Sequence, residues 1–401
     1  MAEPTSYWHA TFEPLVPADE LPDTTEVAVI GGGMLGCWTA YWLARAGVPV
    51  TLLEKNVIGW GATGRNGGFL VGGTASGFGA LARRLGEDAA RQVETIAAEG
   101  RELAGNAIVE EEIACDFRVP GTLSLALSDA ELAEMSADAG SLAKSGFAGE
   151  VLDRAATQEL IHTPLGEEIR GAMYARNGAL VHSERYLCGL AEAVQRHGAR
   201  LVRAVVTGLA SEGDSTRIET TNGALSAGRV VVALNAWTDT LVPALAGKIV
   251  PVRGQILAYA PTERVFESAI GASVTPTGEY WQQTPDGSIV IGGCRDDAPN
   301  GDVGVREMVP TDDVIERIEQ VPPRLFPELS NLTVARRWAG LMAFTSDYVP
   351  VADAAPGLPG VWFGGGFCGH GMPFGPRVGQ LLAEAATSGV TPPALASLRI
   401  D

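Results

Sequence analysis

The sequence predicts an α/β protein with two domains. Three observations support this prediction. First, residues 26–55 read as a strand, a glycine turn, a helix and a second strand in succession. Second, helix and strand patterns alternate again over 184–237, and third, a last strand and helix follow at 361–388. A Rossmann-like nucleotide-binding domain assembled from three separated segments accounts for this alternation. The segments between them predict a second domain of α+β type with a mixed sheet.

The first unit carries a dinucleotide-binding pattern. Residues 26–30, EVAVI, are apolar and rich in β-branched side chains, which is typical of a buried strand. Gly31, Gly33 and Gly36 match G-x-G-x-x-G between this strand and a helical pattern over 37–47. The first glycine permits a tight turn, the second lets a pyrophosphate approach, and the third allows close packing of helix on strand. The helix N-terminus would supply N–H groups and positive dipole to the phosphates.

Glu54 lies at the end of the next strand, PVTLLEK at 49–55. A carboxylate here can accept hydrogen bonds from ribose hydroxyls, and it disfavours a 2′-phosphate. Together the strand, turn, helix and acidic residue predict dinucleotide binding and leave FAD and NAD both open. For the glycine turn alone, the competing interpretation is a turn that merely packs.

Two further glycine-rich stretches favour FAD. Residues 59–69 read GWGATGRNGGF, at a place where an NAD dehydrogenase usually has an ordinary helix. A backbone that is mostly glycine can lie against a flat, bulky ligand and direct its N–H groups at ring oxygens or phosphate. Arg65 would balance negative charge on a pyrophosphate or a reduced flavin. Residues 364–375, GGGFCGHGMPFG, follow a strand and open a helix, which suits the edge of a flavin where negative charge develops on reduction.

Composition excludes several classes of partner. The chain has 401 residues, 46% of them apolar and 19% charged, with a formal net charge of −19. Nucleic acids and anionic membranes need basic patches, so we expect neither as a partner. We see no signal peptide and no stretch approaching the roughly 20 apolar residues of a membrane span. The five scattered cysteines predict no disulfide framework and no metal site, and we expect a reducing cytoplasm.

The remaining patterns set the expected domain segments. Residues 80–114 are rich in Ala, Glu and Arg and predict helix, and residues 128–146 open with a Ser–Asp capping pattern and predict another. Residues 249–295 are β-rich, with a Pro-Asp-Gly turn. We therefore expect a dinucleotide-binding domain, which the further glycine-rich stretches make FAD-binding, at 1–87, 151–239 and 335–401, and a substrate-binding domain at 88–150 and 240–334.

Eight stretches of the chain, taken in order, carry a resemblance to a known family. They are VAVIGGGMLG with LLEK (27–36 and 52–55), GWGATGRNGG (59–68), GTLSLA (121–126), NGALVHSERYLCGLAEA (177–193), GRVVVALNAW (228–237), PVRGQ (251–255), RRWAGLMAFTSDYVPV (336–351) and GGGFCGHGMPFGP (364–376). In this ordered set the chain resembles the FAD-dependent oxidoreductases of the D-amino-acid oxidase superfamily, which includes glycine oxidase and monomeric sarcosine oxidase. The versions with GRNGG and WAGLMAFTSD look most like the gamma-glutamylputrescine oxidase branch.

The resemblance implies which residues would hold the FAD. It places the glycines of the first turn on the pyrophosphate, Glu54 on the adenosine ribose, the strand around Val206 and Thr207 on the adenine, and Gly369 to Met372 on the ring. The whole set that it implies is Gly31, Gly33, Met34, Leu35, Gly36, Glu54, Lys55, Gly61, Ala62, Thr63, Arg65, Asn66, Gly67, Gly68, Val206, Thr207, Ala233, Trp237, Gly366, Gly369, His370, Gly371 and Met372.

Three departures from the family pattern bear on substrate and cofactor. Met342 stands where glycine oxidase-like members carry an Arg that grips the α-carboxylate, and Pro373 follows GHGM where sarcosine oxidase-like members carry a Lys. A charge-assisted carboxylate anchor is therefore missing, and we do not expect a simple α-amino acid as substrate. Residues 336–350 contain no Cys for flavin attachment, so we expect non-covalent FAD. Cys368 is expected to be a packing residue.

The implied reaction is amine oxidation. A hydride passes from the carbon bearing nitrogen to the flavin, the imine hydrolyses to an aldehyde or ketone, and oxygen reoxidises the flavin to give hydrogen peroxide. The substrate would be a small primary or secondary amine, such as a polyamine-derived or ω-amino compound. A close alternative is an amino-acid oxidase or dehydrogenase in which another Arg, such as Arg337, binds the carboxylate. Alternatives of another class are a non-catalytic or sensing flavoprotein and an NAD-binding protein.

Four side chains are the candidates for contact with the reacting groups. His370 would hydrogen-bond at the flavin or relay a proton, with a structural role as the alternative. Tyr280 and Trp281, on a strand of the second domain, would form an aromatic wall, with core packing as the alternative. Met342 occupies the place of the missing anchor. We expect His182, in the ALVHS segment, to be structural.

Overall fold

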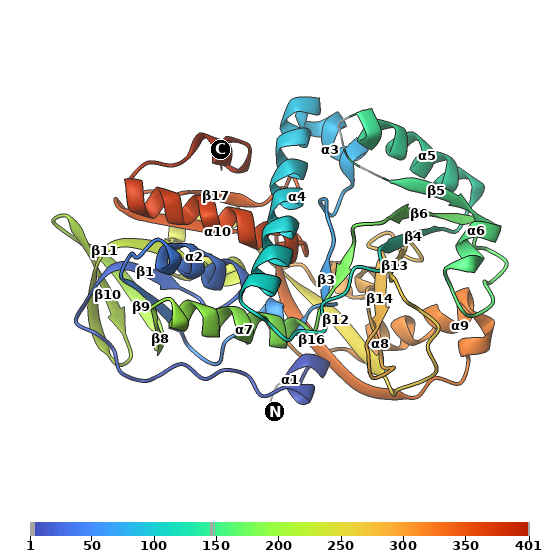
Figure 1. Cartoon of the computed structure of the whole chain (residues 1–401), viewed down its shortest axis with the longest axis horizontal. Helices are drawn as coiled ribbons and strands as arrows, with labels where there is room; N and C mark the ends of the chain where they lie inside the picture. Colours follow the sequence, from blue (N-terminus) through green and yellow to red (C-terminus); the bar gives the residue numbers. More distant parts are fainter. Residues whose placement is uncertain (1–4, 145–146, 148, 400–401) are drawn as a thin grey trace.

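Two eight-stranded sheets organise this computed structural model, which describes residues 5–144, 147 and 149–399. They lie side by side, with helices packed on each (Figure 1). The expected α/β fold with a second, mixed sheet is confirmed. Within the described ranges, no helix is long and apolar enough to cross a membrane.

The first sheet is the nucleotide-binding one, and its central strands are parallel. Val27 to Ile30 pair with residues of β11 on one side and of β2 on the other, and all four are buried. The sheet has the order β17 (Val351–Ala354), β18 (Val361–Gly365), β11 (Gly223–Val232), β1 (Thr24–Ile30), β2 (Val50–Glu54) and β8 (Arg200–Arg203), with β10 (Ser215–Thr220) and β9 (Val206–Glu212) attached antiparallel beside β11. Because the parallel strands share a direction, their carboxyl ends meet at one edge, where ligands of such sheets bind.

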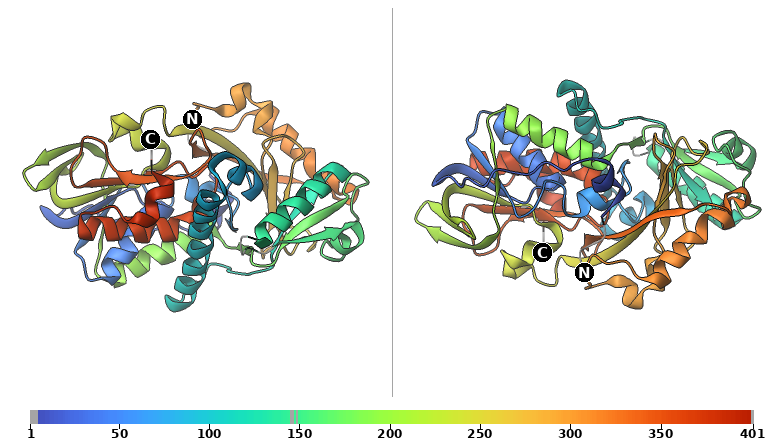
Figure 2. Two further views of the ribbon diagram at one scale, coloured as in Figure 1. Left: turned by 90° about the horizontal axis from the view of Figure 1, so that it is seen from above. Right: turned by 90° about the horizontal axis from the view of Figure 1, so that it is seen from below.

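Helices from distant parts of the chain cover this sheet. They are α2 (Met34–Arg45), α4 (Glu87–Glu110), α7 (Ser183–Arg196) and α10 (Gly371–Ser388). Seen from above and below, the N-terminal strands and the C-terminal α10 lie together in one half of the molecule (Figure 2). Glycines allow the close approach of α10: a Cβ on Gly379 would lie 2.8 Å from Trp38 of α2, and one on Gly100 of α4 would overlap the Pro373 carbonyl oxygen.

The second sheet has its own core. Its order is β16 (Val334–Phe344), β12 (Val250–Tyr259), β15 (Ile289–Gly292), β14 (Glu279–Gln283), β13 (Ala269–Ala272), β4 (Thr122–Ala126), β6 (Gly171–Ala175) and β5 (Glu150–Asp153). All neighbours pair antiparallel except β13 and β4. Helices α8 (Asp312–Glu319) and α9 (Val321–Leu325) contribute Val314, Ile318 and Leu325 to this core. The remaining α-helices and strands are α1 (Tyr7–Thr11), α3 (Phe78–Leu85), α5 (Asp129–Lys144), α6 (Arg154–Glu159), β3 (Phe69–Leu70) and β7 (Ala179–Leu180).

The segments that build each sheet differ from the expected domain segments. Strands β5 and β6, which fall in or next to the expected FAD-binding segment 151–239, pair in the second sheet. Strand β16, most of which falls in 335–401, pairs with β12 there as well. Conversely, α4 was expected in the substrate-binding domain, yet it packs on α10 beside the first sheet. The local pattern of apolar residues identifies a strand, but hydrogen-bonded pairing with distant strands decides which sheet it joins.

Some expected boundaries also shift. Gly86, with φ +87°, separates α3 from α4 within the helix expected over 80–114. The expected strand over 199–210 is two strands, β8 and β9. The expected helix over 128–146 is α5, whose last two expected residues lie outside the described residues, as do 1–4, 148 and 400–401 of the expected domain segments.

Candidate active site

A cavity of about 840 Å³ lies where the carboxyl ends of the first sheet face the second sheet. The first sheet contributes Gly31 after β1, Glu54 at the end of β2 and Ala233 after β11. The second sheet contributes Tyr280 of β14 and Met342 of β16. This volume is at the upper end of the roughly 300–1,000 Å³ of ligand sites, so the cavity has room for a large cofactor.

Two glycines of the first turn are required by the protein itself. Gly31 has φ +114°, and a Cβ there would lie 2.6 Å from the carbonyl oxygen of Ala233. A Cβ on Gly36 would overlap the carbonyl oxygen of Gly31. Gly36 therefore serves the packing of α2 on β1 and does not line the cavity, in contrast to its expected cofactor contact.

Gly33 differs from the other two glycines. Its φ of −90° suits any residue, and a Cβ there would meet only Thr63 Oγ1, at 3.6 Å. Nothing in the described chain requires a glycine at this position, whereas a ligand pressed against the backbone would. Gly33 is also the N-cap of α2 and has no side chain to cap it, so the positive end of this helix faces the cavity. These features suit a pyrophosphate.

Glu54 holds the turn that precedes α2. Its Oε2 accepts a hydrogen bond from the Gly32 N–H at 2.7 Å, and its Oε1 accepts one from the Asn56 N–H at 2.9 Å. Burial raises the pKa of this carboxyl, and the two backbone hydrogen bonds oppose that rise. Each oxygen keeps a second lone pair for a ribose hydroxyl. Lys55, at the same edge, places Nζ 4.9 Å from the centre of the Trp237 ring.

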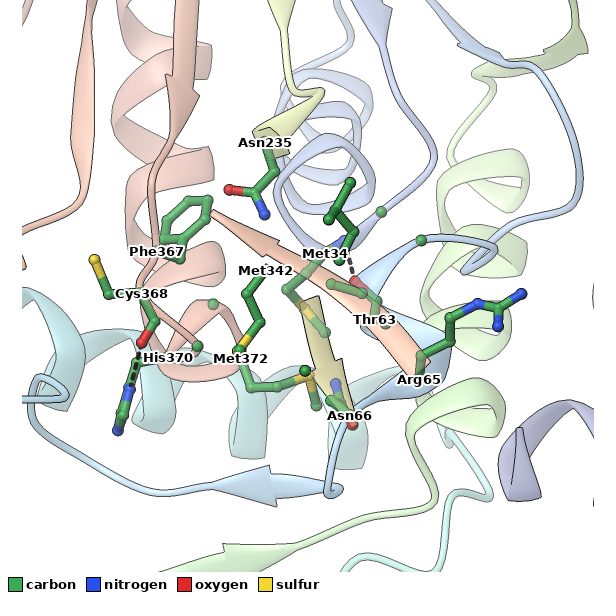
Figure 3. A pocket seen from close by; sticks show the side chains of 18 of the residues that line it. Met34, Thr63, Arg65, Asn66, Asn235, Met342, Phe367, Cys368, His370 and Met372 are labelled. Carbon is green, nitrogen blue, oxygen red and sulfur yellow. Dashed lines mark hydrogen bonds between the residues drawn. The ribbon is translucent and has the colours of Figure 1, made fainter. Parts of the chain in front are cut away.

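The expected role of Arg65 in charge balance is not supported by its placement. Its guanidinium donates to the carbonyl oxygens of Trp60, at 3.1 Å, and Ala339, at 3.2 Å, and lies 4.8 Å from the centre of the Trp60 ring. The side chain is 2% exposed and points away from the centre of the cavity (Figure 3). Arg65 instead ties the short helix η1 (Ala62–Arg65) to β16, and its backbone lines the cavity beside Gly340.

The rest of the second glycine stretch (residues 59–69) is held by helix α7 and the second sheet. Asn66 Oδ1 accepts from the Gly68 N–H at 2.9 Å and from Ser183 Oγ at 2.5 Å. The carbonyl oxygens of Gly67 and Gly68 accept from Gln282 Nε2 at 2.5 and 3.2 Å. Gly68 has φ +78° and turns away from the cavity, so it shapes the turn and does not line the site as expected.

Tyr280 and Trp281 point to opposite faces of β14. Tyr280 lines the cavity, and a Cβ on Gly67 would lie 3.0 Å from its ring. Burial raises the pKa of its hydroxyl to about 12, and no described residue makes a hydrogen bond with that hydroxyl. Trp281 is 2% exposed and packs edge-on against Phe266 and Phe326 in the second core. The expected aromatic wall therefore contains Tyr280 alone, because successive strand residues face opposite sides.

The third glycine stretch (residues 364–375) places His370 beside the cavity. His370 Nδ1 lies 3.3 Å from the carbonyl oxygen of Cys368. Since a carbonyl only accepts, Nδ1 carries the proton and Nε2 is the free acceptor of the neutral ring. Burial lowers the pKa of His370, which favours this neutral form. Burial also raises the pKa of the Cys368 thiol, so it remains protonated.

Met342 and Met372 form the sulfur-rich side of the cavity. Their side chains extend into the same region, between the second glycine stretch and His370 (Figure 3). A Cβ on Gly369 would lie 3.4 Å from Met342 Sδ, and one on Gly254 would lie 3.0 Å from Met342 Cε. Met342 thus contacts the third glycine stretch and the second sheet at once.

Most of the expected site residues come together around this cavity. Gly31, Gly33, Met34, Leu35, Glu54, Lys55, Gly61, Ala62, Thr63, Arg65, Asn66, Gly67, Val206, Ala233, Trp237, Tyr280, Met342, Gly369, His370, Gly371 and Met372 line it. Besides Gly36, Gly68 and Trp281, two others do not. Thr207 is exposed and bonds the Glu219 carbonyl oxygen, and Gly366 donates its N–H to Asn235 Oδ1 at 3.0 Å.

Arg337, the alternative carboxylate anchor, also lies outside the cavity. Its Nη2 is 2.6 Å from Glu319 Oε1, on the face of β16 opposite to Met342. The two positions differ by an odd number of residues, and successive side chains of a strand alternate between its faces.

Several cavity residues were not foreseen. They include Asn235, Arg295, Phe344, Phe367 and Tyr348. Asn235 was signalled by the NAW stretch, where it has φ +46°. Arg295 and Phe344 meet only through the fold, and neither has a local signal. Among the described residues, no group of three or more His, Cys, Asp or Glu side chains is placed to hold a metal.

The chain is similar to known FAD-dependent oxidoreductases over most of its length. Residues 26–385 match the family described as FAD dependent oxidoreductase (DAO). The chain is 29% identical over 397 residues to gamma-glutamylputrescine oxidoreductase of Escherichia coli, covering 95% of this chain and 88% of that protein. It is 27% identical over 376 residues to glycine oxidase of Pseudomonas putida, covering 90% and 94%.

The fold is shared with solved structures of related enzymes. L-proline dehydrogenase from P. horikoshii superposes with a TM-score of 0.78 and 27% identity, over 92% of this chain and 95% of that chain. Glycine oxidase from Bacillus cereus superposes with a TM-score of 0.79 and 21% identity, over 94% and 99%. The chain therefore belongs to the FAD dependent oxidoreductase family, and it is an FAD-dependent enzyme that acts on the CH–NH groups of amines or amino acids.

Proposed function

We propose that this enzyme oxidises a primary or secondary amine and returns the electrons to oxygen, giving hydrogen peroxide. The observation that carries the proposal is Met342, which puts a thioether beside the third glycine stretch at the position where the family resemblance expects a carboxylate-binding guanidinium. A thioether makes no charge-assisted bond to a carboxylate, but it packs well against the carbon chain of an amine. FAD, when bound, would supply the hydride acceptor.

The glycine-rich turns would hold the cofactor without a covalent bond. Gly33 and the N-terminus of α2 would receive the pyrophosphate, Glu54 the ribose, and Gly369 to Met372 the ring. Within the described part of the chain, Cys368 is the cysteine that lines the cavity, and its buried, protonated thiol is a poor nucleophile. Non-covalent FAD stays a prediction, as does the reducing cytoplasm expected from the cysteine pattern.

The surroundings of Met342 favour a neutral amine. Met372 and Phe367 line this part of the cavity and disfavour a buried cation. Loss of the ammonium proton exposes the nitrogen lone pair, which assists removal of a hydride from the adjacent carbon. The free Nε2 of His370 is an acceptor for that proton, and the Tyr280 hydroxyl oxygen is an acceptor for an amine N–H, which leaves the lone pair free.

The proposal is tested with purified, FAD-saturated protein mixed anaerobically with a panel of amines and α-amino acids. We expect amines to bleach the flavin absorbance and α-amino acids to leave it unchanged. Readmission of air should then restore the absorbance and release one hydrogen peroxide per flavin. Bleaching by α-amino acids alone would contradict the amine assignment, and a flavin that air does not reoxidise would make the enzyme a dehydrogenase.

A further inference from the structure

Arg295 is a cation of the cavity whose hydrogen-bond donors are not used. It begins η4 (Arg295–Asp297), directly after β15, and lines the cavity. Its Cζ lies 4.6 Å from the centre of the Phe344 ring. Within the described ranges, no hydrogen bond or ion pair engages its guanidinium.

The acidic residues next to Arg295 are held elsewhere. Asp296 Oδ2 accepts from the N–H and the hydroxyl of Thr277, at 2.8 and 2.5 Å. Asp297 lies 3.6 Å from Arg317 Nε. The other cations that line the cavity also have partners, since Arg65 bonds two carbonyl oxygens and Lys55 lies over Trp237. Arg295 thus presents its planar donors to the cavity with no carboxylate of the described chain to satisfy them.

Arg295 contacts strand β16 at Phe344, and the place of Phe344 along this strand indicates how far Arg295 lies from Met342. Gly340, Met342 and Phe344 share one face of this strand, because they are two residues apart. Gly340 contacts Arg65 of the second glycine stretch, and Met342 contacts Gly369. The ring of Phe344 lies against the guanidinium of Arg295. A strand rises about 3.3 Å per residue, so Phe344 lies about 7 Å beyond Met342. Arg295 therefore contacts this strand face at Phe344, beyond Met342 as counted from Gly340.

We propose that Arg295 binds a carboxylate at the end of the substrate remote from the oxidised nitrogen. The substrate class is then an amine whose carbon chain separates nitrogen from carboxylate by several bonds. An α-amino acid carries both groups on one carbon and cannot reach from Met342 to Arg295. A guanidinium held against a ring is preorganised for a bidentate carboxylate contact. This inference rests on the amine oxidation proposed above.

The test uses a ladder of ω-amino carboxylates of increasing length: glycine, β-alanine, γ-aminobutyrate and δ-aminovalerate. Each is paired with the alkylamine of the same carbon chain that lacks the carboxylate, from methylamine to butylamine. Anaerobic flavin reduction gives the rate and the apparent affinity for each. In the wild type we expect the carboxylate to improve affinity only for the longer members, by about 10- to 100-fold, the range for a hydrogen bond to a charged group.

Arg295→Met should remove this gain, so that each longer ω-amino carboxylate falls to about the affinity of its paired alkylamine. Arg295→Lys should recover part of it, since it keeps the charge but not the planar donors. Arg176→Met is the matched control. Arg176 is exposed, lies over Tyr174 at 5.6 Å and does not line the cavity, so the substitution removes the same charge and should leave both series unchanged. A readout without turnover is the flavin spectral change on adding valerate, which should be lost in Arg295→Met and kept in Arg176→Met.

The outcomes separate the two proposals. If no amine of either series reduces the flavin, amine oxidation itself is wrong. If alkylamines reduce it and Arg295→Met changes both series equally, only the carboxylate role of Arg295 is overturned. Glycine as the preferred member of the ladder would overturn it as well, because glycine is too short to reach Arg295.

Discussion

Thr63 Oγ1 accepts a hydrogen bond from the backbone N–H of Met34 at 3.1 Å, and this bond joins the second glycine stretch to the N-terminus of α2. Thr63→Val keeps the shape but leaves this buried N–H without an acceptor. We expect the Kd for FAD to rise about tenfold, as a cost near 1.4 kcal/mol predicts. Thr63→Ser keeps the acceptor and should bind FAD like the wild type. Titration of the apoprotein with FAD measures both, and equal Kd values for Val and Ser would contradict the role.

Gly33→Ala and Gly36→Ala should fail in different ways. A Cβ on Gly36 overlaps the Gly31 carbonyl oxygen, so Gly36→Ala should lower the melting temperature of the apoprotein or prevent folding. A Cβ on Gly33 enters open cavity, so Gly33→Ala should fold normally and lose FAD. Apoprotein melting and flavin content distinguish the two. Normal FAD content in Gly33→Ala would mean that no ligand lies against this backbone.

Glu54 is expected to select the ribose and to hold Gly32. Glu54→Arg reverses the charge and removes the acceptors of the Gly32 and Asn56 N–H groups, so little FAD should remain after gel filtration. Glu54→Gln retains one acceptor oxygen and should give intermediate retention. The measurement is flavin absorbance per protein. An unchanged ratio in Glu54→Arg would contradict the ribose contact.

Tyr280 and Trp281 offer neighbouring substitutions with opposite consequences. Trp281→Ala empties part of the second core and should cost about 3–5 kcal/mol of unfolding free energy. Tyr280→Phe removes a hydroxyl that faces the cavity and should leave stability unchanged while lowering kcat/KM for the amine. Denaturant unfolding and steady-state kinetics together check the pair. A destabilised Tyr280→Phe with normal kinetics would place its hydroxyl in the core and not in the site.

His182 makes the folded protein sensitive to acid. Burial, followed by the charge of Arg185, lowers its pKa to about 4, and its Nδ1 accepts from the Arg185 N–H at 3.3 Å. The unfolded chain, with a pKa near 6.5, binds the proton first as pH falls. The contribution of His182 is therefore complete above about pH 6.5 and is lost towards pH 4, by about 2 kcal/mol at about pH 5.

His182→Asn isolates this effect. Asn keeps an acceptor at the N-cap of α7 and does not titrate. Urea unfolding at saturating FAD, at about pH 7 and about pH 5, should show a smaller loss of stability in the variant than in the wild type. An identical loss in both proteins would assign the acid sensitivity to other groups.

Much of the cavity lining could be predicted because it is local. The turn at Gly31 to Gly36, the carboxylate of Glu54 and the stretches at 59–69 and 364–375 each fulfil a steric or hydrogen-bonding need within a short piece of chain. The role of Arg65 could not be predicted this way. Its guanidinium is bound by the Ala339 carbonyl oxygen, which the fold supplies from the second sheet.

The substrate side was harder to predict because its residues come from separate strands. Alternation along β14 requires Tyr280 and Trp281 to face opposite sides, but only the packing of Phe266 and Phe326 decides which of them is buried in the core. Arg295 reaches Phe344 because β12 lies between β15 and β16 and bonds to both.

The sequence by itself determined the fold class, the family and the three glycine-rich stretches that line the cavity, since each depends on the conformation and size of neighbouring residues. Only the tertiary structure decided that Met342, Arg295 and Tyr280 share one cavity and that Trp281, Arg337 and the Arg65 guanidinium do not. The physical reason is that strand pairing over long sequence separations, and not local preference, sets which face of each strand lines the cavity.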